Sequence, residues 1–174
     1  MRLGAARLAA AALLLGLAAC ASAPPRPAPD LAGRLALRID ASAGTPARSL
    51  TTQFELRGDA RSGELQLTTP LGSTAAQARW QPGAAELITP DGTRHYGDLD
   101  ALAQDMLGEI LPLAALIDWL RGRAWLGAPS TPSGSGFEQL GWRIDLSRLA
   151  EGWVVAARDA APALLVRARL EKAE

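Results

Sequence analysis

Four consecutive segments of the chain alternate apolar and polar side chains with the period of two that is typical of half-buried β-strands. They run over residues 33–40, 49–58, 63–69 and 75–81. A fifth strand pattern, an Asp91-Gly92 turn and a sixth strand pattern follow within residues 86–97. Together these segments predict an antiparallel meander with one face in solvent and one apolar face.

The period changes after this meander, where apolar positions take helical spacing. Asp98 is a predicted N-cap, because its carboxylate can accept a hydrogen bond from a backbone N–H of the first turn. Gly108 interrupts this first helix, and a second helix begins near Pro112 and ends at Gly122. Residues 128–136 are predicted to be a loop. Three further strand patterns follow over residues 137–146, 152–159 and 163–171. This order predicts one α+β domain built on a curved antiparallel sheet.

The two predicted helices need an apolar surface to pack against, and the apolar face of the sheet is the only large one that the pattern provides. Periodicity does not decide whether the interior between helices and sheet is a packed core or an open cavity. Alternation and helical spacing select the candidate lining positions, which are Leu35, Leu37, Phe54, Leu65, Leu67, Trp80, Met106, Leu113, Leu116, Ile117, Leu120, Trp142 and Ile144.

The N-terminal end carries the marks of an export signal. Two arginines precede an apolar run over residues 8–19, which is shorter than the roughly 20 apolar residues that span a bilayer. Cys20, the single cysteine of the chain, follows directly. The sequence Leu-Ala-Ala-Cys at 17–20 resembles the bacterial lipobox. This resemblance implies that residues 1–19 are removed and that Cys20 carries the lipid anchor.

A proline-rich segment follows the cysteine. Residues 20–30 have a composition that cannot form a packed core, and they are predicted to be a short tether between the anchor and the domain. Residues 31–174 remain as a single domain, which we expect to act as a monomer.

Composition and motifs weigh against several classes of function. Eighteen basic and eighteen acidic side chains give a net charge of zero, without the cationic surface that nucleic-acid binding needs. His95 is the single histidine, and no metal-ligand spacing or phosphate-binding loop occurs. We therefore expect no cofactor, no use of ATP and no catalysis, although an anchored enzyme acting on lipid or envelope polymer stays an alternative.

The turn between the third and fourth predicted strands has an unusual tip. Pro70-Leu71-Gly72 puts a leucine where turns normally carry a polar side chain. Pro70 and Gly72 restrict the turn, so that Leu71 either projects into solvent or folds back onto the domain's own core. The residues alone leave both possibilities open.

Several elements in this order resemble the LolB family of outer-membrane lipoprotein receptors. They are the lipobox, GRLALRI at 33–39, LQLTTPLGSTAAQARW at 65–80, LPLAALIDWLRG at 111–122 and FEQLGWRI at 137–144. The resemblance covers residues 17 to about 170. It implies an incomplete, eleven-stranded antiparallel barrel whose helices cover an apolar cavity.

The resemblance also implies a function. Members accept acylated lipoproteins from a LolA-like periplasmic carrier chaperone and insert them into the inner leaflet of the outer membrane. In the family, the leucine of this turn projects into solvent and takes part in membrane insertion of the cargo; here it corresponds to Leu71. Because the chain has no visible nucleotide site, we expect the transfer to run downhill without ATP. A scaffolding lipoprotein with a solid core and a protein partner is the main alternative.

Overall fold

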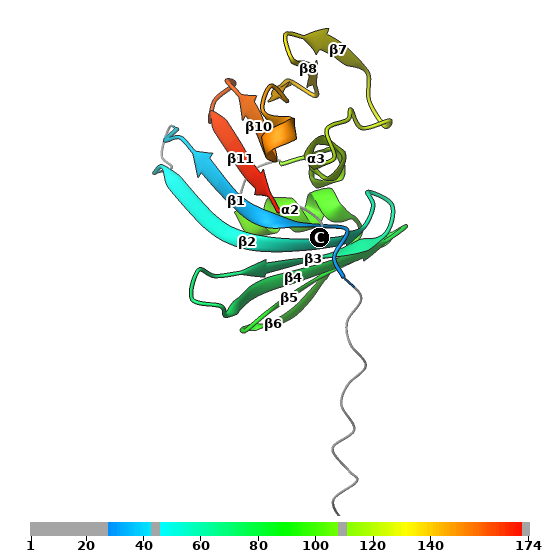
Figure 1. Ribbon diagram of the computed structural model, residues 1–174. Helices are drawn as coiled ribbons and strands as arrows, with labels where there is room; N and C mark the ends of the chain where they lie inside the picture. The colour runs from blue at the N-terminus through cyan, green and yellow to red at the C-terminus, as the bar shows by residue number, and fades with distance from the viewer. Residues whose placement is uncertain (1–27, 43–45, 108–110, 172–174) are drawn as a thin grey trace, which may run out of the picture.

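The computed structural model describes residues 28–42, 46–107 and 111–171, and their backbone forms one open, eleven-stranded antiparallel sheet (Figure 1). Its strand order is β6-β5-β4-β3-β2-β1-β11-β10-β9-β8-β7. The strands are β1 Leu31–Ile39, β2 Arg48–Gly58, β3 Gly63–Thr68, β4 Thr74–Gln81, β5 Ala84–Thr89, β6 Gly92–Tyr96, β7 Ser130–Ser133, β8 Gly136–Gln139, β9 Trp142–Asp145, β10 Trp153–Arg158 and β11 Leu164–Leu170. The predicted curved α+β sheet is confirmed.

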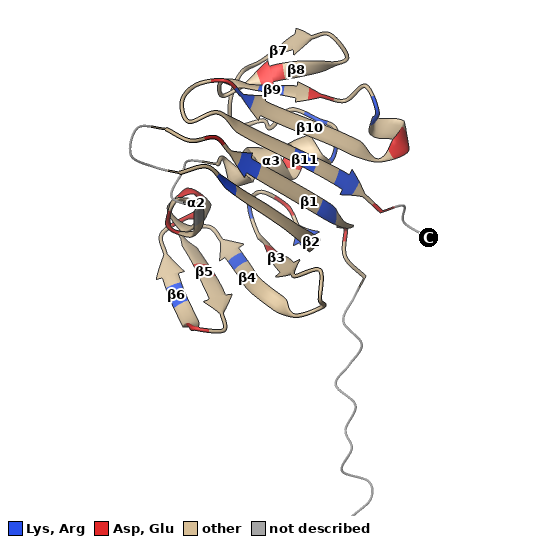
Figure 2. Ribbon diagram, turned by 90° about the vertical axis from the view of Figure 1, so that its left-hand side faces the viewer, with Lys and Arg blue, Asp and Glu red and all other residues tan. Residues whose placement is uncertain are grey.

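The alternation along each strand sorts side chains between the two faces of the sheet. In β1, Leu37 and Ile39 are buried, whereas Arg34 and Arg38 are exposed. The first and last strands lie side by side, with Leu37 opposite Val166. Basic residues occur along β1 and β11 in Figure 2, and the arginines of both strands are exposed. The apolar side chains therefore gather on the concave face.

Two helices lie in the concavity of the sheet (Figure 1): α2 Leu99–Leu107 and α3 Leu113–Leu120. The predicted N-cap is confirmed, because the Asp98 carboxylate accepts the backbone N–H of Ala101 at 2.8 Å. Residue Gly122 follows α3 with φ of 73°, a left-handed conformation that glycine adopts without strain. A short 3-10 helix, η2 Leu149–Glu151, precedes β10.

The prediction of a loop over residues 128–136 was wrong, because the structure forms strand β7 there. Its composition of serine, threonine and proline hides the strand from a pattern search. Since β7 is the last strand of the sheet, it pairs only with β8, and Pro132 lies opposite Phe137. An edge strand tolerates proline because one side of its backbone needs no hydrogen-bonding partner.

Candidate functional site

An apolar cavity of about 70 Å³ lies between α2, the start of α3 and strands β1 to β5. Its lining consists of aliphatic side chains and one hydroxyl, namely Leu35, Leu37, Leu50, Thr52, Leu65, Leu67, Ala76, Ala78, Leu87, Leu102, Ala103, Met106, Leu111, Leu113 and Leu116. The hydroxyl of Thr52 donates to the Thr68 carbonyl oxygen at 2.8 Å. Because that hydroxyl is satisfied by the backbone, the lining offers an apolar surface to any occupant.

The size of this cavity limits what it can hold in this state. A volume of about 70 Å³ is roughly half that of an engineered apolar cavity that binds benzene. Its aliphatic walls offer water no hydrogen-bonding partner, so an apolar occupant is favoured over water there. A long acyl chain needs several times this volume. Binding one therefore requires the surrounding elements to move apart.

Seven of the thirteen predicted lining residues belong to this cavity. They are Leu35, Leu37, Leu65, Leu67, Met106, Leu113 and Leu116. The other six are buried in the core but do not line the cavity: Phe54, Trp80, Ile117, Leu120, Trp142 and Ile144. Alternation assigns a residue to the concave face but does not give its position along the curved sheet. The role of all thirteen toward an acyl chain stays a prediction.

Eight lining residues were missing from the sequence-based set: Leu50, Thr52, Ala76, Ala78, Leu87, Leu102, Ala103 and Leu111. Most of them carry the same signal as the residues that were found. Ala76 and Ala78 alternate with polar side chains in β4, and Leu102 and Ala103 share the apolar spacing of α2. Thr52 shares the period-two spacing of Leu50 and Phe54 in β2, but a polar side chain is not expected on an apolar face.

The opposite half of the concavity is filled. Trp119 of α3 is fully buried, and its ring lies 5.7 Å from the ring of Trp142 at a tilt of 50°. The Trp119 indole N–H donates to Oε1 of the buried Gln139 at 2.8 Å. This aromatic pair and its amide partner fix α3 against β8 and β9.

Helix α2 is attached to the sheet by a polar contact on its solvent side. The Tyr96 hydroxyl of β6 donates to Oδ2 of Asp105, and Arg94 Nη1 lies 2.6 Å from the same carboxylate oxygen. The hydrogen bond to Asp105 and, secondly, burial raise the pKa of Tyr96. We call these three residues the Asp105 latch.

The turn between β3 and β4 holds its leucine in water. Leu71 is 94% exposed, which excludes the alternative in which it folds onto the core. The Gly72 N–H donates to the Thr69 carbonyl oxygen at 2.9 Å, and the Thr69 N–H donates to the Ser73 carbonyl oxygen at 2.8 Å. Gly72 has φ of 86°, so this turn depends on glycine.

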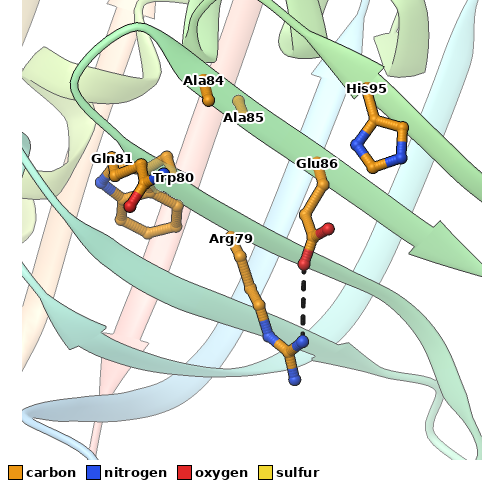
Figure 3. Close-up of a pocket in the computed structure, with 7 residues that line it drawn as sticks. All are labelled: Arg79, Trp80, Gln81, Ala84, Ala85, Glu86 and His95. Carbon is orange, nitrogen blue, oxygen red and sulfur yellow. Dashed lines mark hydrogen bonds and ion pairs between the residues drawn. The ribbon is translucent and has the colours of Figure 1, made fainter.

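His95 lies away from the cavity. It lines an open pocket of about 390 Å³ on the solvent-facing side of β4 to β6, together with Arg79 and Glu86 (Figure 3). Arg79 forms ion pairs with Glu86 at 3.4 Å and with Glu64 at 3.2 Å. Arg79 of β4 is therefore paired with a carboxylate on each neighbouring strand, β3 and β5.

In the part of the chain that the structure describes, no group of three or more histidine, cysteine, aspartate or glutamate side chains is arranged to hold a metal ion. Among the same residues, no helix has both the length and the apolar character needed to cross a membrane. The predicted anchor Cys20 and the signal at 1–19 lie outside the described residues, as does most of the tether.

The fold and the site together define a class: an open antiparallel half-barrel with a helix-covered apolar cavity and a leucine on a rigid turn. A family model described as "Outer membrane lipoprotein LolB" matches residues 30–167, and the chain belongs to this family.

Relatives agree with this assignment. An outer-membrane lipoprotein LolB from Bordetella petrii is 39% identical over 176 residues, which cover 93% of this chain and 84% of the relative. The protein of the same name from Bordetella pertussis is 38% identical over 150 residues, covering 78% and 75%. That from Chromobacterium violaceum is 32% identical over 148 residues, covering 83% and 82%.

Proposed function

We propose that this protein is a lipid-anchored receptor on the periplasmic face of the outer membrane, which takes acylated lipoproteins from a LolA-like periplasmic carrier and inserts them into the inner leaflet. The observation that carries the proposal is the pairing of an aliphatic cavity with a fully exposed turn leucine in a chain of the LolB family. The aliphatic lining of the cavity can contact the acyl chains of the cargo, and the exposed leucine of the turn can contact the bilayer.

The cavity receives acyl chains by enlarging. Apart from Thr52, its lining is made of leucine, alanine and methionine side chains, which can rearrange without breaking a side-chain hydrogen bond. Helix α2 is the element that moves, because the Asp105 latch on its exposed side is a weak contact. Helix α3 stays in place, because its Trp119 is fixed in the packed half of the concavity.

Transfer needs no ATP in this proposal. The acyl chains pass from the carrier's cavity to this one and then to the bilayer, each step being downhill in free energy. An affinity difference of about 1.4 kcal/mol is tenfold, so small differences between the three environments direct the cargo.

The turn carries out the last step. Transfer of one leucine side chain from water to an apolar environment is favourable by about 1.5–3 kcal/mol. This free energy allows Leu71 to enter the bilayer briefly but does not hold the domain there. Stable attachment comes instead from the acyl chains on Cys20, because two or more chains are needed for a firm anchor.

Exchange of Leu71 tests this proposal. The lipidated chain, as wild type or as Leu71→Glu, is placed in vesicles and given a carrier–lipoprotein complex without ATP. We expect the variant to take cargo from the carrier but to leave it extractable by alkaline carbonate, because a carboxylate at the tip opposes entry into lipid. Leu140→Glu, in the exposed β8–β9 turn, is the matched control and should insert cargo normally. Normal insertion by Leu71→Glu would refute the role of the turn.

The same assay separates the alternatives. A scaffolding lipoprotein would take no cargo from the carrier in any variant. An enzyme acting through His95 would lose its activity on substitution of that residue, whereas we expect cargo transfer by His95→Gln to equal that of the wild type.

A further inference from the structure

A second leucine projects into solvent in another part of the molecule. Leu126 is 99% exposed, in the segment over residues 121–129 that joins α3 to β7. Single apolar residues on a surface are common and do not indicate a function by themselves. The support beneath Leu126 and its place beside the tether distinguish it from an incidental surface leucine.

A buried amide shapes the backbone on both sides of Leu126. Gln139 is 2% exposed, and its Nε2 donates to the carbonyl oxygens of Trp125 at 2.7 Å and Ala128 at 2.8 Å. Its Oε1 accepts the backbone N–H of Trp125 at 3.0 Å and the indole N–H of Trp119. These bonds use both donors and both acceptor sites of the amide. The segment is therefore held from the core, and its leucine is kept in water by a defined backbone.

The same segment lies where the tether enters the domain. Arg121 Nη2 donates to the Gly58 carbonyl oxygen at 2.6 Å, and the Gly58 N–H donates to Oδ2 of Asp30 at 2.7 Å. Asp30 is the last residue of the predicted tether. Trp125 lines a groove together with the β2–β3 and β4–β5 turns, which belong to this same end of the sheet.

Leu71 lies at the opposite end. Strand β3 begins beside the β2–β3 turn and runs six residues away from it before the turn that carries Leu71. At about 3.3 Å per residue, the strand separates the two ends by roughly 20 Å. The domain thus presents one rigidly supported, exposed leucine at each end.

We propose that the segment over residues 121–129 is a second lipid contact, on which the domain rests against the bilayer beside its own anchor. This inference depends on the proposed lipidation of Cys20. Leu126 enters the outer part of the acyl region, and the half-buried Trp125 lies at the level of the headgroups, where indole rings are favoured. Leu71 then faces away from the bilayer until the domain turns over to deliver cargo.

The length of the tether permits both orientations. The eleven residues over 20–30 reach at most about 40 Å when fully extended. One leucine contributes far less than the acyl chains of the anchor, so Leu126 sets the orientation of the domain and not its attachment. Charges of both signs lie at this end, including Asp30, Arg61 and Arg121, so salt should have little effect on the contact.

A site-specific probe tests this contact. In the full-length Leu126→Cys variant, position 126 carries the only free thiol once Cys20 is lipidated, and it takes an environment-sensitive fluorophore. The labelled chain is inserted into vesicles of phosphatidylethanolamine and phosphatidylglycerol without cargo or carrier. Leu140→Cys, labelled in the same way at the exposed β8–β9 turn, is the matched control.

We expect spin-labelled lipids to quench the probe at 126 severalfold more than the probe at 140, and to do so equally at low and high salt. Equal quenching at the two positions would overturn the inference. A change in the fluorescence of the probe at 126 that occurs only after a carrier protein is added would overturn it too. Flotation of the chain with the vesicles shows separately whether the lipid anchor holds the chain on the membrane. A chain that floats but shows no quenching refutes only this contact, whereas a chain that does not float refutes the anchor and the contact with it.

Discussion

The two halves of the concavity are covered by consecutive helices, but they differ in the side chains that fill the space between helix and sheet. Beneath α2, the sheet presents leucines and alanines such as Leu67, Ala76 and Ala78. Beneath α3, Trp119 and Trp142 fill the space. The same alternation of apolar and polar residues therefore produces a cavity or a solid core, depending on the volume of the side chains that face inward.

The halves also differ in how their helix is held. A buried aromatic pair and the hydrogen bond to Gln139 hold α3, and removing any of these groups leaves a void or an unsatisfied polar atom. The exposed Asp105 latch and aliphatic contacts hold α2. This contrast is the physical reason to assign movement to α2 and rigidity to α3.

The largest expected effect is the loss of the aromatic pair. Trp119→Ala should lower the free energy of unfolding by about 3–5 kcal/mol, because it opens a void and removes one of the two hydrogen bonds that the buried Gln139 Oε1 accepts. Leu67→Ala, a half-buried position on the existing cavity, should lower it by only about 1–2 kcal/mol. Urea denaturation of both variants measures the difference. Equal losses would show that the two halves are packed alike.

One substitution made in both halves gives a sharper comparison. Ala156→Leu adds three carbons to the packed half, where the alanine is buried, and overpacking should cost about 1–3 kcal/mol. Ala76→Leu adds the same atoms beside the cavity and should stay within about 1 kcal/mol of the wild-type stability. Denaturation curves give both values, and a similar loss in the two variants would contradict the assignment of the cavity.

Ala76→Leu also separates the proposed function from a scaffolding role. Since the added side chain occupies the space that acyl chains need, we expect the variant to accept less cargo from the carrier although it is folded. A scaffolding protein with a solid core would show no functional change.

The sequence predicted the sheet better than it predicted the site. Alternation in β1 to β6 and the Asp98 cap located the meander and the first helix, because each depends on local spacing alone. Strand β7 was missed because an edge strand needs no apolar pattern. Leu71 was selected correctly as a turn residue, and its exposure was then settled by the structure.

The cavity could be predicted only in part, for a reason that lies in the curvature of the sheet. Leu67 and Trp142 carry the same alternation signal, although one lines the cavity and the other belongs to the packed half. The difference arises from which strands face α2 and which face α3, and this depends on contacts between residues far apart in the sequence. Thr52 lines the cavity although its side chain is polar. Its hydroxyl donates to the Thr68 carbonyl oxygen of the neighbouring strand, a contact that the pattern of apolar and polar residues does not reveal.

The smallest expected effect on stability tests the latch on α2. Asp105→Ala removes the contacts to Tyr96 and Arg94, and because the Asp105 and Arg94 side chains are exposed, the free energy of unfolding should change by no more than about 1 kcal/mol. Binding of a fluorescent fatty acid to the cavity should nevertheless become faster, since α2 is released from β6. Unchanged binding kinetics would show that the latch does not control access.

High pH should also make the wild-type protein bind the fluorescent fatty acid faster. The hydrogen bond to Asp105 raises the folded-state pKa of Tyr96 above its ordinary value of 10.0, so its contribution is complete below pH 10 and is lost as the pH rises through the folded-state pKa. Faster binding above pH 10 in the wild type, but not in Tyr96→Phe, would assign the effect to this hydroxyl. A rise of equal size in both proteins would assign it to another group and leave the movement of α2 without its proposed control.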